Sequence, residues 1–350
     1  MSSRDEQTVR AFLAPLRTIP PVTRRPRELQ RRVPQLVALA AIAVGAFALL
    51  ALVALLAAHR SPSTPPPTHP AGHPARTSGM IAVSGEHGVI AFDPAHRRPP
   101  VTITSQPGSP LAFSADGTNL LVVRTDGLYV ISADGIERET KVAAAGTAGG
   151  SFTPDGAAVI YGAKGSIWRV AISGGPATTI AWSSKYAAKT FPGFTGGQLS
   201  PDGTTIVYDR ATGIHPSDQS IWLMDTNGRN RRPLVSYQQV AALTGFTGQL
   251  DIFALAWYPD SSRLLVIAAP MLHGPDCAVL SVSRDGSDLR RFGPTDICPA
   301  RAAAEPGGSH FAFTGLDPRH DTITITTLDG QTTENVKPPG AYEPFFTWAP

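Results

Sequence analysis

Four side chains in the second half of the chain could transfer protons or bind a metal ion. They are His215, Asp251, His273 and Asp276, and they fall in three long segments between predicted strands. Imidazoles and carboxylates that converge on one point are a common set for acid–base catalysis and for divalent cations. On exposed Gly/Pro-rich segments, however, these residue types are more often simply solvated. We therefore expect no metal site and no catalytic residue.

The sequence lacks the motifs of several enzyme classes. It contains no Gly-x-Ser-x-Gly nucleophile elbow, no His-Glu-x-x-His zinc motif, no phosphate-binding glycine loop and no dinucleotide fingerprint. We accordingly expect a protein that is not an enzyme and needs no cofactor. One enzymatic alternative stays open: a hydrolase or lyase that acts on an envelope polymer through His215 and His273 and the neighbouring loop aspartates.

The two cysteines of the chain, Cys277 and Cys298, are expected to form a disulfide. Cys277 begins a predicted strand, and Cys298 follows the strand that pairs with it across a turn near Gly286, so both fall at the same edge. Two thiols placed together outside the cytoplasm generally pair. The bond would clamp residues 269–276. Thiol catalysis lacks support, because neither a Cys-x-x-Cys motif nor an adjacent base is present.

Aspartates recur in short turns, at Asp116, Asp155, Asp202 and Asp260. The Asp side chain accepts hydrogen bonds from the backbone of a tight turn, and the Gly that usually follows adopts a positive φ at little cost. The turns therefore account for these carboxylates, and we assign no chemistry to them.

Each of these turns belongs to a phrase that repeats along the chain. The copies are Phe-Ser-Ala-Asp-Gly at 113–117, Phe-Thr-Pro-Asp-Gly at 152–156, Leu-Ser-Pro-Asp-Gly at 199–203, Trp-Tyr-Pro-Asp-Ser at 257–261 and Ala-Glu-Pro-Gly-Gly at 304–308, and the truncated Phe-Thr-Trp-Ala-Pro at 346–350. A short apolar strand follows each complete copy. Repeats of about 40 to 60 residues built from short strands and tight turns are typical of β-propellers, whose blades bury their faces against one another.

The first repeat lacks an inner strand of its own. Residues 80–84, 89–93 and 101–104 provide three strands, and residues 345–349 provide a fourth at the other end of the sequence. Pairing the last strand with the first closes the ring and leaves no long open sheet edge. We therefore predict an all-β fold, a six-bladed β-propeller in which the C-terminal strand completes blade one.

The repeat resembles that of TolB-type, WD40-like β-propellers. The resemblance rests on the (Phe/Trp)-x-Pro-Asp-Gly phrase, the apolar strand after it, an Ile-Trp or Leu-Tyr strand and a second x-Asp-Gly turn, and it covers about residues 79–350. It implies the fold, whereas propellers of this kind serve as scaffolds, as domains of prolyl-oligopeptidase-like peptidases and as parts of polysaccharide lyases. TolB has an α/β domain before its propeller. In this chain a predicted helix and a Pro-rich segment occupy that place, so it resembles the repeat and not TolB itself.

Long connections are expected to gather on one face of the predicted ring, over blades four and five. They are loops between second and third strands or crossings between blades, at residues 182–196, 209–219, 236–252 and 269–276. Phe194 and Phe246, each in a Gly-Phe-Thr-Gly sequence, are expected to face inward. The candidate binding residues are aromatic, amphipathic or charged: Tyr186, Lys189, Phe191, His215, Tyr237, Gln238, Asp251, Met271, His273 and Asp276. Such side chains on a rigid scaffold suit a surface that binds a protein or peptide.

Charge and hydropathy change near residue 60. Residues 1–60 carry nine Arg, no Lys and three acidic residues, whereas residues 61–350 carry 21 basic and 24 acidic side chains. Residues 36–58 form an apolar run of 23 residues, which is long enough to cross a hydrocarbon core of about 30 Å. Arginines cluster before this run, which places the N-terminus in the cytoplasm. A cleaved signal peptide is the alternative, although its apolar core is usually only about 7 to 15 residues long.

We therefore expect a single-pass membrane protein with four parts. These are a cytoplasmic Arg-rich arm (1–32), a transmembrane helix (33–60), a Pro-rich linker (61–78) and an extracytoplasmic propeller (79–350). The mildly acidic propeller lacks the basic stripe that nucleic-acid binding requires. The expected partner is an envelope protein or peptide, and the membrane is contacted through one N-terminal helix. A ligand-sensing ectodomain is a further alternative.

Overall fold

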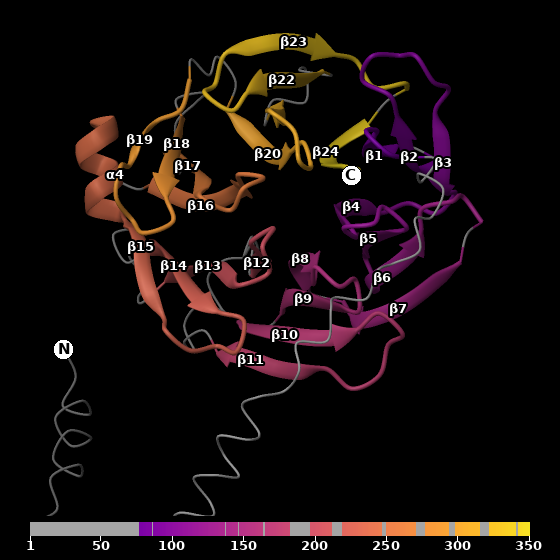
Figure 1. The fold of residues 1–350 in the computed structure, drawn as a ribbon, viewed down its shortest axis with the longest axis horizontal. Helices are drawn as coiled ribbons and strands as arrows, with labels where there is room; N and C mark the ends of the chain where they lie inside the picture. The colour runs from indigo at the N-terminus through magenta and orange to yellow at the C-terminus, as the bar shows by residue number, and fades with distance from the viewer. Residues whose placement is uncertain are drawn as a thin grey trace, which may run out of the picture. The chain divides into compact units, whose positions relative to one another are not determined.

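Six four-stranded antiparallel sheets surround a common axis in the computed structural model of this chain (Figure 1). The structure describes residues 77–350 except residues 86, 137, 146, 164, 183–196, 212–218, 247–249, 271–276, 294–297, 316–321 and 341. Each sheet is one blade, and the described strands account for all six. The predicted six-bladed, all-β propeller is confirmed.

The blades follow one another along the chain, and each has its strands in meander order. Blade one contains β24 (Tyr342–Trp348), β1 (Ile81–Gly85), β2 (Gly88–Phe92) and β3 (Val101–Thr104), and blade two contains β4 (Ser109–Phe113), β5 (Asn119–Arg124), β6 (Gly127–Ser132) and β7 (Glu139–Ala144). Blade three contains β8 (Thr147–Phe152), β9 (Ala158–Ala163), β10 (Ser166–Ala171) and β11 (Thr178–Trp182), and blade four contains β12 (Gln198–Leu199), β13 (Thr205–Ala211), β14 (Gln219–Asp225) and β15 (Arg232–Ser236). Blade five contains β16 (Leu250–Trp257), β17 (Arg263–Pro270), β18 (Ala278–Ser283) and β19 (Arg290–Arg291), and blade six contains β20 (Pro299–Ala304), β21 (His310–Gly315), β22 (Ile323–Thr327) and β23 (Thr332–Val336).

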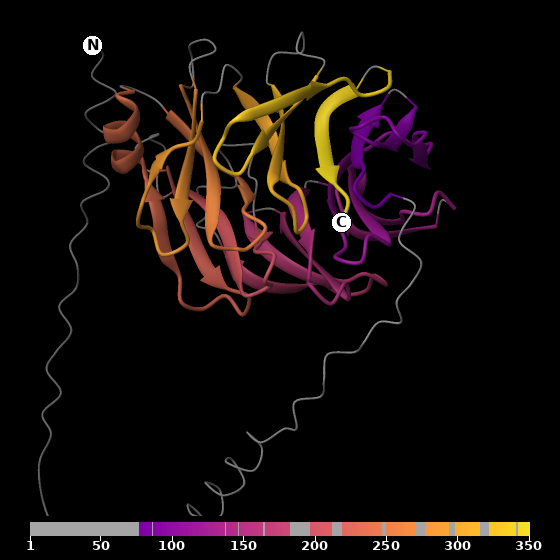
Figure 2. The same cartoon turned by 45° about the horizontal axis from the view of Figure 1, so that its top comes forward.

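The ring closes through the pairing of the last strand with the first. In the antiparallel register of β1 and β24, Ile81 lies opposite Trp348 and Val83 lies opposite Phe346. Figure 2 shows β24 beside β1, although more than 250 residues of sequence separate them. The predicted closure of blade one by the C-terminal strand is therefore correct. Because this pairing covers the exposed edge of β1, the ring has no seam where a further strand could add.

The core of the propeller lies between blades. Ile81 and Val83 of blade one share a hydrophobic cluster with Ala312 and Ile325 of blade six, and Phe346 of β24 is 4% exposed within it. A blade sheet is therefore covered on both faces. This explains why middle strands such as β9 are buried almost without interruption instead of alternating between buried and exposed residues.

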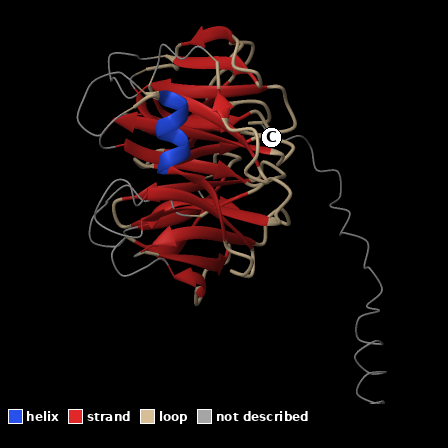
Figure 3. Cartoon of the chain, turned by 90° about the vertical axis from the view of Figure 1, so that its left-hand side faces the viewer, coloured by secondary structure: helices blue, strands red, loops and turns tan. Residues whose placement is uncertain are grey.

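The tight turns after the inner strands have the predicted chemistry. In the first of them, Asp116 Oδ1 accepts hydrogen bonds from Ser114 Oγ at 2.6 Å and from Thr118 N at 3.0 Å, and Gly117 has φ of +68°. Ser261 occupies the corresponding glycine position in blade five with φ of +62°. Figure 3 shows these short turns on one side of the propeller, where the C-terminus also lies. We call this side the turn face, and the opposite side the crossing face.

A short helix in the crossing from blade four to blade five is a feature that the sequence analysis missed. Helix α4 (Tyr237–Thr244) lies on the outer rim of the ring (Figure 1). Ser236 and Gln239 form a capping box at its start, and Gly245 ends it with φ of +76°. Eight residues with one capping box give too weak a periodic signal to separate this helix from a long loop.

The predicted disulfide is present, with 5.4 Å between the Cα atoms of Cys277 and Cys298. Cys277 precedes β18 of blade five, and Cys298 precedes β20, the inner strand of blade six. The bond therefore ties two neighbouring blades together at the crossing face.

The predicted membrane anchor lies outside the described residues. Within the part of the chain that the structure describes, no helix is long and apolar enough to cross a membrane. The arm at 1–32, the helix at 33–60 and nearly all of the linker at 61–78 fall in residues 1–76, which are not described.

Candidate functional site: a cavity on the propeller axis

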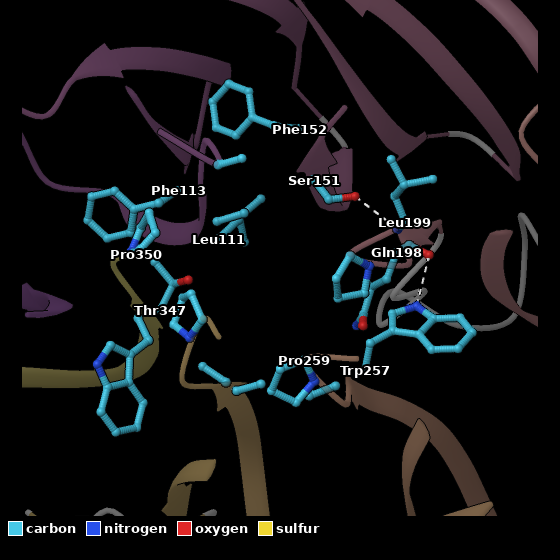
Figure 4. A pocket seen from close by; sticks show the side chains of 18 of the residues that line it. Leu111, Phe113, Ser151, Phe152, Gln198, Leu199, Trp257, Pro259, Thr347 and Pro350 are labelled. Carbon is cyan, nitrogen blue, oxygen red and sulfur yellow. Dashed lines mark hydrogen bonds between the residues drawn. The ribbon is translucent and has the colours of Figure 1, made fainter. Parts of the chain in front are cut away.

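A cavity of about 400 Å³ lies on the axis of the ring. Residues of the six inner strands and of the turns that follow them form its wall, so every blade contributes. Figure 4 shows some of these side chains, including Leu111 of β4, Trp257 of β16 and Thr347 of β24, around the opening. The wall consists mainly of aliphatic, aromatic and proline side chains, with a few neutral polar groups and two ionisable side chains, Arg301 and Glu305.

The turn-face end of the cavity is bordered by one equivalent position from each blade. These six residues, which we call the collar, are Ala115, Pro154, Pro201, Pro259, Pro306 and Pro350. Five of them stand two positions after the apolar residue that begins the repeated phrase, and Pro350 stands two positions after Trp348 in the truncated copy. Proline suits the position because its fixed φ favours the first central residue of a tight turn. Five proline rings and the methyl group of Ala115 therefore surround the mouth of the cavity.

β-bulges in the inner strands shape the wall between the collar and the crossing face. The strand register shifts between Pro110 and Ala112 in β4, and again between Ala254 and Ala256 in β16. The extra residues at these bulges, Leu111 and Leu255, are half-buried and line the cavity. A bulge breaks the two-residue alternation of a strand. Here it adds apolar side chains to the axis without changing the faces packed between blades.

Polar groups of the wall mostly bond to one another. Ser151 Oγ accepts a hydrogen bond from Leu199 N at 2.9 Å, and Trp257 Nε1 donates to the carbonyl oxygen of Gln198 at 3.4 Å, as the dashed lines in Figure 4 show. The Gln198 amide in turn donates to the carbonyl oxygen of Leu255 at 3.4 Å. These bonds hold the two-residue strand β12 between blades three and five, so the cavity is preformed.

Two ionisable side chains line the described cavity wall, and their surroundings differ. Glu305 accepts a hydrogen bond from Ser309 N at 3.0 Å and lies 2.9 Å from Nδ1 of His310. Arg301 is half-buried and stacks on Phe345, with its guanidinium carbon 4.6 Å from the ring centroid. Within the described part of the chain it has no ion pair and no side-chain hydrogen bond. Burial lowers the pKa of the Arg301 guanidinium, but arginine stays protonated in proteins.

Three of the ten predicted binding residues are described. Tyr237 is half-buried and packs against the hydrophobic cluster of blades four and five, whereas Gln238 is exposed on the first turn of α4. Phe246 packs against the same cluster, which confirms the prediction that it faces inward. The other seven predicted binding residues lie outside the described residues, as does Phe194: Tyr186, Lys189, Phe191, His215, Met271, His273 and Asp276.

Asp251, the third described candidate, lies between blades four and five. Its Oδ1 accepts a hydrogen bond from Gln219 Nε2 at 3.2 Å, and Gln219 Oε1 accepts one from Ile252 N at 3.1 Å. Burial raises the pKa of Asp251, and the bond from Gln219 opposes this. Among the described residues, no three His, Cys, Asp or Glu side chains are grouped closely enough to hold a metal ion. The proposed convergence of histidines and aspartates therefore stays a prediction.

The axial cavity is a site that the sequence analysis missed. The long loops predicted a binding surface on the crossing face. The wall of the cavity is instead formed by residues of the repeated phrase. One signal was available, because the repeated proline follows an inner strand and must border the axis of any propeller built from these blades. Arg301 carried no signal, since nothing in the sequence shows that it lacks a partner.

Solved structures with the same architecture include two TolB proteins. TolB from Acinetobacter baumannii is 16% identical, with a TM-score of 0.59 over 80% of this chain and 69% of the other. A TolB-like protein from Agrobacterium tumefaciens is 18% identical, with a TM-score of 0.51 over 77% of this chain and 98% of the other. The fold is that of TolB-type propellers. It also occurs in enzymes: a gluconolactonase from Xanthomonas campestris is 15% identical, with a TM-score of 0.50 over 78% of this chain and 90% of the other.

Comparisons of the sequence itself add no relative. No model of a protein family matches the chain. No curated protein matches it either. At the identities of the structural neighbours only the fold is shared, so the function must be argued from this chain's own site.

Proposed function

We propose that this protein is a non-catalytic scaffold that binds a short peptide segment of a partner protein in the axial cavity. The observation that carries the proposal is the cavity itself, preformed, mainly apolar and entered through the collar. Its volume lies within the range of about 300 to 1,000 Å³ that is usual for ligand pockets. Apolar walls with few polar groups suit the side chains of an extended peptide, because affinity then comes from burial of apolar surface.

The composition of the wall favours binding over catalysis. Acid–base or nucleophilic catalysis needs at least two groups placed around a reacting atom. In the described wall Glu305 is engaged by Ser309 and His310, and Arg301 is the one remaining charge. A single cation can orient a ligand but supplies neither a general base nor a nucleophile.

We further propose that the scaffold is tethered to the membrane and faces the cell envelope. The apolar run at 36–58, the arginines before it and the Pro-rich segment after it support a single N-terminal anchor. The disulfide between Cys277 and Cys298 supports an oxidising compartment for the propeller. The long connections over blades four and five are proposed as a second contact surface for the same partner.

An obstruction placed in the collar tests the binding proposal. Ala115 is the one collar residue that is not proline, and it is exposed in its turn. Replacing Ala115 with Trp puts a large ring at the mouth and should weaken binding of peptides selected on the full-length protein by about tenfold or more, measured by isothermal titration calorimetry. Ala157→Trp is the matched control, because Ala157 is exposed in the next turn but does not line the cavity. Equal binding by both variants and the parent protein would refute the proposed site.

A further inference from the structure

We propose that Arg301 is the anchor of the axial cavity and binds a carboxylate group of the peptide ligand. This inference rests on the proposed function and names the chemical class of the group that the cavity recognises. It concerns a residue that lines the cavity and has no polar partner for its side chain in the described structure.

The electrostatic argument concerns the balance of charge in the wall. A half-buried cation is stable only if something solvates or neutralises it, because desolvation costs free energy. Glu305, the other ionisable side chain of the wall, bonds to Ser309 N and His310 and makes no ion pair with Arg301. Arg301 thus has no ion-pair partner among the described residues, and an anion that entered the cavity would supply one.

The surroundings of the guanidinium combine one aromatic contact with donors that have no partner among the described residues. The guanidinium carbon of Arg301 lies over the ring of Phe345, 4.6 Å from its centroid. The N–H donors of an arginine project from the edge of the planar group and match the two oxygens of a carboxylate. Because no described residue accepts a hydrogen bond from the Arg301 side chain, a carboxylate that reached it would find donors to bind.

The position of Arg301 along β20 favours a group at or near the end of a peptide. Arg301 precedes the last residue of β20, Ala304, by three positions, and the collar residue Pro306 follows in the turn. At about 3.3 Å per residue, the backbone of Arg301 lies about 10 Å from the turn end of the strand. An extended peptide that enters through the collar therefore spans this depth with about three residues. The apolar wall would bury their side chains, and the carboxylate would meet Arg301.

The experiment begins with selection of a random dodecapeptide library on the immobilised full-length protein. Selected peptides are synthesised in three forms: with a free C-terminal carboxylate, as the C-terminal amide, and with each Asp or Glu changed to Asn or Gln. Their affinities are measured for the parent protein, Arg301→Gln and Arg301→Lys. Arg290→Gln is the control, since Arg290 is an exposed arginine on the outer strand β19 and does not line the cavity.

We expect Arg301→Gln to weaken binding of the carboxylate peptide by about tenfold or more, as is usual for a hydrogen-bonded charge. Removing the recognised carboxylate from the peptide should weaken its binding to the parent protein by the same factor. The same change in the peptide should have little further effect on its affinity for Arg301→Gln. Loss on amidation identifies the C-terminal carboxylate as the group, and loss on Asp or Glu replacement identifies a side chain. Arg301→Lys should recover only part of the affinity, because it keeps the charge without the planar fork, and Arg290→Gln should bind normally.

A purely structural role for Arg301 makes different predictions. If the stack on Phe345 mattered only for stability, Arg301→Gln would lower the melting temperature and bind all three peptide forms as the parent does. That result overturns the inference but leaves the proposed function standing, provided that Ala115→Trp still abolishes binding. If Ala115→Trp also binds normally, the proposed function fails with it.

Discussion

At the residue scale, Asp202 links two neighbouring blades as well as closing its own hairpin turn. Asp202 accepts hydrogen bonds from Ser200 Oγ at 2.5 Å and Thr204 N at 3.0 Å, and pairs with Arg284 of blade five at 2.6 Å. Burial would raise the pKa of Asp202, but these bonds to its ionised form outweigh it and hold the pKa well below its usual range. The turn that contains Asp202, which the local sequence predicts, therefore also forms a contact between blades four and five.

Replacing Asp202 with Asn should destabilise the propeller at neutral pH and less so in acid. A depressed carboxyl pKa contributes stability above the unfolded-state value of about 3.9, and this contribution is lost as the pH falls below it. We expect a loss of about 1 kcal/mol at pH 7 after allowance for solvent screening, because the side chain is partly exposed. The difference in the free energy of unfolding between Asp202→Asn and the parent protein should become smaller towards pH 3. Urea unfolding at both pH values measures it, with exposed Glu334→Gln as the control.

At the scale of elements, the disulfide joins two neighbouring blades. Cys277 precedes β18 and Cys298 precedes β20, so the bond spans the short strand β19 and the crossing that follows it. β19 contains only two residues and both are exposed. The neighbouring Phe292 is buried against Phe311 and Phe313 of blade six, and the covalent bond adds a second link between the two blades.

Removal of the disulfide should lower stability by about 3 kcal/mol, the value expected for a closed loop of this length. The bond joins residues 21 positions apart. Thermal unfolding of the Cys277→Ser/Cys298→Ser double variant should therefore begin at lower temperature than that of the parent. A reducing agent should destabilise the parent to a similar extent and leave the double variant unchanged. A parent whose unfolding ignored the reducing agent would contradict this account.

At the scale of the whole molecule, closure of the ring makes the propeller one cooperative unit. The two ends of the described chain meet in blade one, and the cluster around Phe346 also contains residues of blade six. Blade six thus packs against a sheet that exists only if the C-terminal strand has found β1. The axial cavity depends on the same closure, because Phe346, Thr347 and Pro350 line it.

The variant Phe346→Ala should destabilise the whole propeller by about 3 to 5 kcal/mol, because Phe346 is nearly fully buried and its loss leaves a cavity between blades one and six. Chemical unfolding followed by tryptophan fluorescence measures the change, since tryptophans lie in several blades. Ile136→Ala is the control, because Ile136 is 63% exposed and should change stability by less than about 0.5 kcal/mol. An effect confined to blade one would show that closure is not cooperative.

The sequence by itself determined the number of blades, the closing strand, the turn chemistry and the disulfide. These features are encoded locally: a phrase such as Phe-Thr-Pro-Asp-Gly sets one hairpin, and its six occurrences count the blades. The missing inner strand of the first repeat and the surplus strand at the C-terminus predicted the closure. The inward orientation of Phe246 also followed from its repeated context.

The axial cavity, by contrast, becomes visible only in the folded molecule. The cavity brings together Leu111, Trp257 and Arg301 from three different blades, and their meeting depends on how the blades pack around the axis. The absence of a partner for Arg301 is likewise a property of its surroundings in space. Helix α4 forms in a segment with a single capping box, which is too weak a signal to distinguish a short helix from a loop. Distances between residues far apart in sequence are set by packing between sheets, which no local pattern encodes.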